Sequence, residues 1–306
     1  MTLERSFDYE IFFLSYREPN ADENYQDLLK KLSKARFSHV PEVRRVHGVK
    51  GIDAAHKRCA ELARAPYMLT VDGDCKLDPE FFREVIPHIE PSETSVLIFP
   101  AENVVNGLQY GNGSLKIWPV EIILKAGPMG LDYCCTLPRK KGHLINKCYA
   151  FTYINSSPEQ AWMAGFREGV KLSMLRAGPG PALNDISDDN LRRLRVWCCV
   201  GADRPNGLWA ILGARQGTLY ALADAGAEAA RLVNDFDWLR ERFSSQEPLR
   251  EGRLEWLLEQ AGEALRKLYD FEVVTFNRNK SRIFKLAYFN PRYIAADDGW
   301  VSVGRH

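Results

Sequence analysis

Apolar residues in the first hundred positions follow two different spacings. Short runs rich in β-branched and aromatic residues predict buried strands, and apolar residues that recur every three or four positions predict amphipathic helices. The expected strands are 9–16, 43–47, 67–71 and 95–100, and the expected helices are 24–35, 52–63 and 79–89. Strands that alternate with helices in this way predict an α/β fold whose central sheet is mostly parallel.

The rest of the chain changes character towards its end. Residues 104–119 are rich in Gly and Asn, which predicts a functional loop or a hairpin. Further strands are expected at 131–133, 147–153, 271–276 and 282–289, and further helices at 158–175, 221–242 and 249–269. The run Ala177-Gly178-Pro179-Gly180-Pro181 is the clearest break, so we expect a catalytic core over 1–176 and a mainly helical region with terminal strands over 177–306.

Composition narrows the class of protein. The chain has 306 residues, of which 45% are hydrophobic, and its 41 Lys+Arg against 40 Asp+Glu leave a formal charge of +1. This composition excludes disordered and collagen-like chains, and the near-neutral charge excludes a histone-like cationic coat. A near-neutral net charge is still compatible with local basic patches.

The lengths of the apolar runs and the pattern of cysteines indicate the cellular compartment of the protein. The apolar runs are strand-sized, shorter than the ~18 residues typical of a membrane-spanning helix, and the first residues lack the apolar stretch of a secretory leader. The 7 cysteines form no CxxC motif, so we expect reduced, mostly buried thiols rather than a zinc site. These features predict a cytoplasmic protein without a membrane segment.

Asp72-Gly73-Asp74 directly follows the strand expected at 67–71. Ligands of open α/β sheets gather at the carboxyl ends of the strands, and Gly73 lets the chain turn sharply there. Two carboxylates at this edge suit Mn²⁺ or Mg²⁺ with a nucleotide diphosphate. The alternative is that they only cap a turn, as an isolated Asp-x-Asp does more often.

Five ordered blocks of sequence extend this interpretation. They are 12–25, 45–52 with Ala55-His56-Lys57, Val71-Asp72-Gly73-Asp74, Tyr110-Gly111-Asn112-Gly113 with Lys116 and Pro119, and Phe166-Arg167-Glu168 with Val170-Lys171-Leu172. Together they resemble the phage-type GT-A glycosyltransferases associated with TET/JBP-type dioxygenases, over roughly residues 9–175. The resemblance implies a GT-A fold, a UDP-sugar donor, Mn²⁺ or Mg²⁺, and transfer of a sugar to a hydroxymethylated pyrimidine in DNA.

The resemblance also implies roles for particular residues. Those placed at the donor are Ser15, Tyr16, Pro19, Lys50, Gly51, Asp72, Tyr110, Gly111 and Lys116. Asp72 would contact the ribose or the metal, and Asp74 the metal. Ser114 stands where the family pattern has a second glycine. Lys50 can equally be a solvated turn lysine, and the loop at Tyr110 a plain hairpin turn.

Sugar transfer by inversion needs a carboxylate to deprotonate the acceptor hydroxyl. The two candidates are Asp132, near the expected acceptor-side strand, and Glu168. Either can instead be structural, Asp132 at a strand end and Glu168 in a helical ion pair. His143 fits an exposed basic turn and His56 a helix surface, so the third metal ligand is left unassigned.

A DNA acceptor needs cations that neutralise phosphates. Three groups of basic residues qualify: Arg139-Lys140-Lys141 with Lys147, Arg192-Arg193 with Arg195, and Arg278, Lys280, Arg282 and Lys285. Each is also explained by an ordinary solvated face. The leading hypothesis is a metal-dependent glycosyltransferase acting on 5-hydroxymethylcytosine in phage DNA. The alternatives are a GT-A enzyme for a glycan or small acceptor, and a non-catalytic phage DNA-binding protein.

Overall fold

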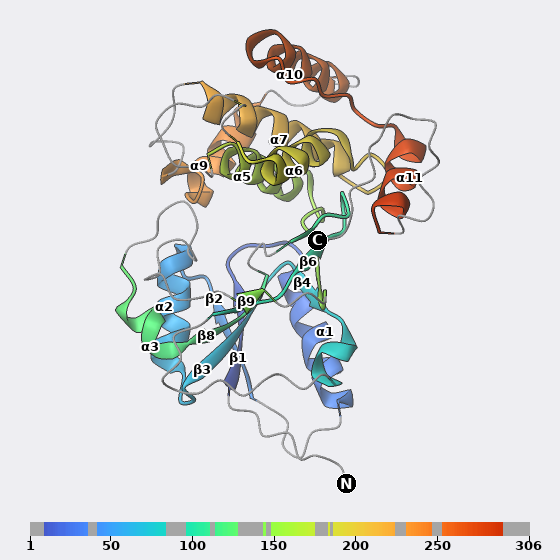
Figure 1. The fold of residues 1–306 in the computed structure, drawn as a ribbon. Coiled ribbons are helices and arrows are strands. Elements are labelled where there is room, and N and C mark those ends of the chain that lie inside the picture. The colour runs from blue at the N-terminus through green and yellow to red at the C-terminus, as the bar shows by residue number, and fades with distance from the viewer. Residues whose placement is uncertain are drawn as a thin grey trace.

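The fold consists of an α/β part and a layer of helices (Figure 1). The computed structural model describes residues 9–35, 42–83, 96–110, 114–127, 143–144, 148–174, 183, 186–223, 231–246 and 253–289. Within these ranges, no helix combines the length and the apolar character needed to cross a bilayer.

The main sheet has the strand order β2-β1-β3-β8-β5-β9. Its strands are β1 (Tyr9–Ser15), β2 (Val43–His47), β3 (Tyr67–Asp72), β5 (Leu97–Ile98), β8 (Leu115–Pro119) and β9 (His143–Leu144). β1 pairs in parallel with β2 and β3, and β5 pairs in parallel with β9, whereas β8 runs antiparallel to both of its neighbours. The expected α/β class with a mostly parallel sheet is confirmed.

Alternate residues of β1 face opposite layers, as the two-residue period of a strand requires. Ile11 and Phe13 pack with Leu28 of α1 (Ala21–Lys34) on one face. Phe12 packs on the other face with the helices α2 (Ile52–Leu62) and α3 (Val120–Lys125). Figure 1 shows the sheet between α1 and the α2–α3 pair. The central strand is therefore buried on both sides, which explains its unbroken apolar run.

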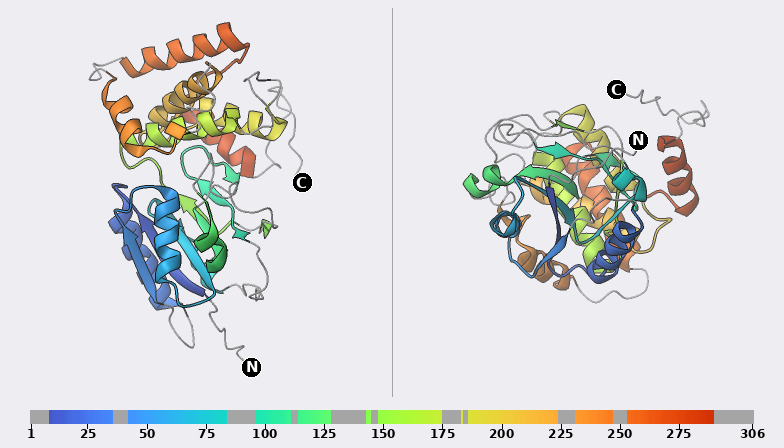
Figure 2. Two further views of the ribbon diagram at one scale, coloured as in Figure 1. Left: turned by 90° about the vertical axis from the view of Figure 1, so that its left-hand side faces the viewer. Right: turned by 90° about the horizontal axis from the view of Figure 1, so that it is seen from below.

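A second, smaller sheet lies between the main sheet and the helices (Figure 2). Its order is β4-β10-β6-β7, with β4 (Cys75–Leu77), β6 (Ala101–Asn103), β7 (Gln109–Tyr110) and β10 (Ala150–Thr152). A 3-10 helix, η1 (Pro79–Arg83), follows β4. Because β4 begins directly after Asp74, this sheet fixes the far side of the acidic turn.

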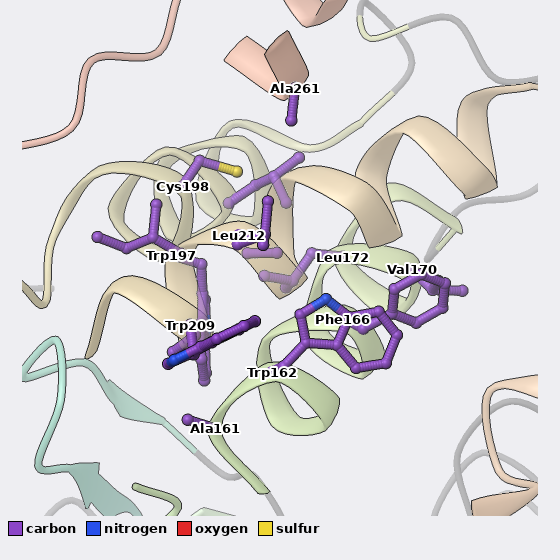
Figure 3. Close-up of a cluster of buried hydrophobic side chains, with 14 of the residues drawn as sticks. Ala161, Trp162, Phe166, Val170, Leu172, Trp197, Cys198, Trp209, Leu212 and Ala261 are labelled. Atoms are coloured by element: carbon purple, nitrogen blue, oxygen red, sulfur yellow. The ribbon is translucent and has the colours of Figure 1, made fainter. Parts of the chain in front are cut away.

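The helical layer contains α5 (Pro158–Met174), α6 (Asp188–Cys199), α7 (Gly207–Leu222), α9 (Phe236–Ser244), α10 (Arg253–Tyr269) and α11 (Arg278–Phe289). Its core is rich in aromatic residues, including Trp162, Phe166, Trp197 and Trp209 (Figure 3). The buried face of α5 belongs to this core. The helical packing therefore begins before residue 177, where the sequence places the division between the two regions.

Small residues let α5 and α7 cross with their backbones nearly in contact. A Cβ added at Gly165 would lie 2.0 Å from the carbonyl oxygen of Ala210, and one at Gly213 would lie 2.1 Å from that of Trp162. Gly169 and Gly217 are equally tight. Glycine is therefore required at this crossing for close approach, at the expense of helix propensity.

The strands expected at the end of the chain are wrong. Residues 271–276 form no strand, and 278–289 are the helix α11. The segment contains Phe284, Tyr288 and Phe289, and aromatic residues are common in strands. The residues that α11 buries, Ser281 and Lys285, are instead four positions apart, as on one face of a helix.

The expectation of mostly buried thiols is confirmed for the described residues. Cys59, Cys75, Cys148, Cys198 and Cys199 are all free, and burial raises the pKa of each thiol. Thiols of this kind stay protonated and behave as small apolar side chains.

Candidate functional site

Asp72 and Asp74 lie at the carboxyl end of β3, next to the end of β1. Asp72 is the last residue of β3 and pairs in register with Leu14 of β1. Asp74 follows after Gly73, and both aspartates are half-buried. The carboxylates therefore stand at the sheet edge where an open α/β sheet binds ligands.

The backbone of this turn is held by three separate segments. The amide of Asp72 donates to the carbonyl oxygen of Ser114 at 3.1 Å. The side-chain amide of Asn24 donates to the carbonyl oxygen of Gly73 at 2.9 Å, and the amide of Tyr153 donates to that of Asp74 at 2.7 Å. Every residue of Asp72-Gly73-Asp74 has its main chain fixed, so the two carboxylates are presented in a defined geometry.

Three carboxyl groups lie close together around this turn. Burial raises the pKa of Asp72 to about 6, and the nearby carboxylate of Glu18 acts in the same direction. Burial, together with Asp72 and Glu18, raises the pKa of Asp74 to about 8. Glu18 stands over Gly73, where an added Cβ would lie 2.8 Å from its Oε2. Carboxylates crowded in this way favour a bound cation.

Three basic side chains act on the carboxyl group of Asp72, and one of them also acts on that of Asp74. Lys116, Arg167 and Lys171 each hold the pKa of Asp72 down, and Arg167 does so for Asp74. Lys116 is 6% exposed, with its ammonium 5.3 Å from the centre of the Trp118 ring. Arg167 is also bound to the turn before α9, through the carbonyl oxygen of Val233. Acidic and basic groups therefore meet at one place.

Asn24 offers a direct test of the fixed turn. Asn24→Asp keeps the shape of the side chain but sets a carboxylate oxygen against the carbonyl oxygen of Gly73, so we expect a loss of about 1 to 3 kcal/mol in unfolding free energy. Chemical denaturation measures it. Asn277→Asp is the matched control, because Asn277 uses its side-chain oxygen to accept from the amide of Lys280, which aspartate also does. Equal stabilities of the two variants would contradict the role of Asn24.

The end of β1 and the loop after it carry three of the expected donor residues. Ser15 is buried, and its hydroxyl contacts His47 Nδ1 at 2.9 Å and accepts from Arg45 at 3.0 Å. The amide of Tyr16 donates to Glu18 at 2.8 Å, and Pro19 is exposed. Ser15 therefore fixes the loop, whereas Tyr16 and Pro19 lie nearer its outer side.

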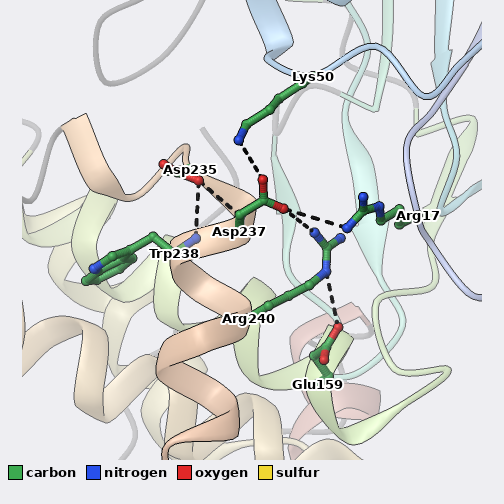
Figure 4. Close-up of polar contacts among 7 residues, drawn as sticks. All are labelled: Arg17, Lys50, Glu159, Asp235, Asp237, Trp238 and Arg240. Atoms are coloured by element: carbon green, nitrogen blue, oxygen red, sulfur yellow. Dashed lines mark hydrogen bonds and ion pairs between the residues drawn. The ribbon is translucent and has the colours of Figure 1, made fainter.

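Lys50 lies in an ion-pair cluster that joins this loop to α9 (Figure 4). Asp237 of α9 accepts from Lys50 at 2.5 Å and also pairs with Arg17 at 3.7 Å and Arg240 at 3.2 Å. Its hydrogen bond raises the pKa of Lys50. Arg240 reaches Glu159 at 3.5 Å as well. Lys50 is thus an exposed lysine that pairs with Asp237, and its place at the donor site stays a prediction. Gly51, at φ +97°, is the residue before α2.

Arg240 joins three parts of the chain, and its removal should be measurable. Its guanidinium lies 5.5 Å from the centre of the Tyr16 ring, and its side chain is only 21% exposed. We expect Arg240→Met to lower the unfolding free energy by about 1 kcal/mol, the upper end for such pairs. Arg58→Met, which breaks an exposed pair with Glu61 on α2, should leave thermal unfolding unchanged. A similar loss in both variants would contradict a special role for Arg240.

Tyr110 and Glu168 are brought into contact with each other. The Tyr110 hydroxyl donates to the Glu168 carboxylate and accepts from the Trp197 indole at 3.1 Å. Burial raises the pKa of Tyr110 well above its usual range. The hydrogen bond orients Glu168 towards β7 and α6.

Several expectations fall outside the described residues. Asp132, Gly111, Arg139-Lys140-Lys141 and Lys147 belong to them, and so does the side chain of His143. They stay predictions. His56 is buried rather than on a helix surface, with Nδ1 2.8 Å from the carbonyl oxygen of Ile52.

The donor atoms fit a hard divalent cation. Asp72 and Asp74 offer carboxylate oxygens, which Mg²⁺ and Mn²⁺ prefer. Within the described ranges, no group of three or more acidic, histidine or cysteine side chains could hold a metal ion. The two aspartates would therefore need water and diphosphate oxygens as further ligands.

Sequence analysis missed several residues of the site. Glu18, Asn24 and the α9 pair Asp237 and Arg240 received no role, and Arg167 was noted only as part of a block. The sequence position of Glu18 could have predicted a role at the site, because it is an acidic residue just beyond the end of a buried strand. No local sequence pattern could have predicted a role for Asp237, because it contacts Lys50 from 187 positions away in the sequence.

No family model and no curated protein matches this chain. Among solved structures, residues 1–349 of S. aureus TarS are 12% identical, with 94% of this chain and 93% of that chain covered and a TM-score of 0.35. The mannosyltransferase PcManGT from Pyrobaculum calidifontis, in complex with GDP-Man and Mn²⁺, is 11% identical with a TM-score of 0.33, covering 86% and 88% of the two chains.

A glycosyltransferase involved in glycosylation of the PBCV-1 major capsid is 15% identical with a TM-score of 0.25. That match covers 37% of this chain and 61% of that chain. TM-scores of this size do not demonstrate a common fold. The function therefore rests on the chain's own site.

Proposed function

We propose that this chain is a nucleotide-sugar glycosyltransferase that moves a sugar from a UDP-sugar to the hydroxymethyl group of 5-hydroxymethylcytosine in DNA. The observation that carries the proposal is the position of Asp72 and Asp74 at the carboxyl end of β3, where Lys116, Arg167 and Lys171 lower the pKa of Asp72 and Arg167 lowers that of Asp74. The resemblance to phage-type GT-A enzymes supplies the class of donor and acceptor. The proposed cofactor is Mn²⁺ or Mg²⁺.

The charges suit a leaving nucleoside diphosphate. Breaking the bond between sugar and phosphate leaves negative charge on the diphosphate, and fixed cations stabilise that charge without reorganising. The cations that would stabilise the diphosphate charge are Lys116, Arg167 and Lys171. The divalent ion would be held by Asp72 and Asp74. When bound, that ion supplies Lewis-acid neutralisation of the phosphate oxygens.

The nucleoside is proposed to lie along the loop after β1. Tyr16 and Pro19 form its outer side, and Arg17 and Lys50 stand at its rim. Both cations are more than half exposed, at 60% and 64%, so a ligand can draw them away from Asp237 at small cost.

Deprotonation of the acceptor hydroxyl is assigned to Asp132 or Glu168. The described contacts support Glu168 as an oriented carboxylate, since the Tyr110 hydroxyl donates to it. Only the family resemblance supports Asp132 as the catalytic base.

Basic residues of α6 and α11 support a DNA acceptor. Arg192 and Arg193 both act on the pKa of Tyr288, so these helices present neighbouring faces. Arg278, Lys280 and Arg282 are exposed on α11. Lys285 is excluded from this surface, because it is 8% exposed and pairs with Asp203 at 2.5 Å. Cations so placed give salt-dependent binding to phosphates.

One assay tests the proposal. The purified protein is incubated with Mn²⁺, labelled UDP-glucose or UDP-N-acetylglucosamine, and duplex DNA containing either cytosine or 5-hydroxymethylcytosine. Label in the hydroxymethylated DNA alone, lost with EDTA, is the expected result. Donor hydrolysis without labelled DNA would overturn the acceptor and favour a glycan or small-molecule acceptor. DNA binding without any use of the donor would overturn the enzyme and favour a non-catalytic DNA-binding protein.

A further inference from the structure

A hollow of about 480 Å³ lies in the helical layer, among α5, α7 and α9. Leu219, Tyr220 and Ala223 line it from α7, and Arg242, Ser245 and Gln246 line it from the end of α9. Its volume falls in the range of about 300 to 1,000 Å³ typical of sites for small molecules. It is separate from the carboxylate site at β3.

Arg242 brings an uncompensated positive charge to this hollow. Its guanidinium lies 4.9 Å from the centre of the Tyr220 ring and 5.3 Å from those of Phe166 and Trp238. In the part of the chain that the structure describes, no carboxylate pairs with it and no acceptor takes a hydrogen bond from it. Burial lowers the pKa of Arg242, as expected for a cation without a counter-ion. The aromatic rings hold the guanidinium in place but leave its five N–H donors unused.

Gln246 adds a second unused donor, and a chain of hydrogen bonds fixes its orientation. The Trp162 indole can only donate, and it does so to Gln216 Oε1 at 2.6 Å. Gln216 Nε2 must then donate onwards to Gln246 Oε1, at 3.3 Å. This leaves Gln246 Nε2 buried, without a hydrogen-bond partner among the described residues. A buried donor left unpaired is unfavourable, and an acceptor on a ligand would offset that cost.

We propose that this hollow binds a small organic anion, whose carboxylate or phosphate group accepts hydrogen bonds from Arg242 and Gln246. Its apolar body lies against Leu219 and Tyr220. The hollow combines a cation and an amide donor with apolar side chains, so an amphiphilic anion matches both. The proposal does not depend on the glycosyltransferase activity.

The position of Arg242 on α9 links the two sites. Residues two apart on an α-helix point in nearly opposite directions, since successive residues turn by about 100°. Arg240 points to Tyr16 and Glu159, and Arg242 points into the hollow. A ligand in the hollow therefore contacts the helix whose other side holds the loop after β1.

Three probes test the site: phenyl phosphate, benzoate and neutral benzyl alcohol. Ligand-observed NMR with the full chain, in EDTA, measures their dissociation constants. We expect at least one anion to bind tenfold or more tightly than benzyl alcohol, and the stronger of the two shows whether phosphate or carboxylate is preferred. Arg242→Met should weaken that anion at least tenfold, and Gln246→Leu about fivefold. Neither should alter binding of benzyl alcohol.

A control substitution tests whether the loss of anion binding is specific to the hollow. Arg253→Met removes another arginine stacked on an aromatic ring, Trp256 at 4.0 Å, without touching the hollow, and should change nothing. Thermal unfolding verifies that each variant is folded. If Arg242→Met does not fold, the anion affinity of Gln246→Leu tests the proposed site. Anions that bind no better than benzyl alcohol, or binding that survives both substitutions in folded protein, would overturn the proposal.

Discussion

Replacing Asp74 by asparagine should remove Mn²⁺-dependent binding of UDP and lower sugar transfer by about 10²-fold or more. The physical reason is that the proposed ion would lose one of its two carboxylate ligands, and fixed charge around a leaving group is worth several kcal/mol. Asparagine keeps the shape of the side chain at a turn whose backbone is held by Ser114, Asn24 and Tyr153. The loss should therefore appear in metal and UDP binding, measured by calorimetry, without a lower melting temperature.

Asp188→Asn is the matched control for Asp74→Asn. Asp188 is an exposed acidic residue in the first turn of α6, remote in sequence from the carboxylate site. Its replacement should leave metal binding and transfer unchanged. Full Mn²⁺-dependent binding of UDP in Asp74→Asn would sink the assignment of Asp74 as a metal ligand.

Replacing Gly213 by alanine should be among the most destabilising single-methyl changes in this protein. The added Cβ would lie 2.1 Å from the Trp162 carbonyl oxygen, which belongs to the backbone of α5 and has no rotamer to change. The helices must then separate, at about 3 kcal/mol or more on the overpacking scale. That exceeds the ~1 kcal/mol that alanine gains over glycine in helix propensity. Denaturant unfolding followed by circular dichroism measures the difference.

Gly127→Ala supplies the comparison for Gly213→Ala. No atom lies within 4 Å of a Cβ added at Gly127, and its φ is not in the left-handed region, so its unfolding free energy should stay within about 0.5 kcal/mol of the parent. An equally stable Gly213→Ala would mean that α5 and α7 can move apart freely, contrary to the close crossing described above.

The α/β part was predictable because its signals are local. Strands β1, β2 and β3 and helices α1 and α2 follow from apolar spacing, with ends shifted by a few residues at most. The placement of Asp72 and Asp74 at a sheet edge follows from the strand before them. Both inferences use only neighbouring residues and the general rule for open sheets.

The helical part was harder for physical reasons. Helix α7 is apolar on every side and contains Gly213 and Gly217, so it shows neither an amphipathic stripe nor good helix propensity. Its burial between α5, α6 and α10 stabilises it. The cluster at Asp237 was beyond prediction because tertiary packing alone brings α9 to the loop after β1. The aromatic residues of α11 likewise indicate a strand, and its helical state is fixed by tertiary packing.

The three anchors of the acidic turn bear on how the site is assembled. Its hydrogen bonds come from Asn24, Ser114 and Tyr153, which are separated along the chain by whole strands and helices. A fragment that ended after β4 would contain both aspartates and could still form the parallel strands β1, β2 and β3, yet it would lack two of the three anchors. Metal binding should therefore arise late in synthesis, once the segment around Tyr153 has emerged. Two separately expressed pieces cut between these anchors would recover the site only on reassociating.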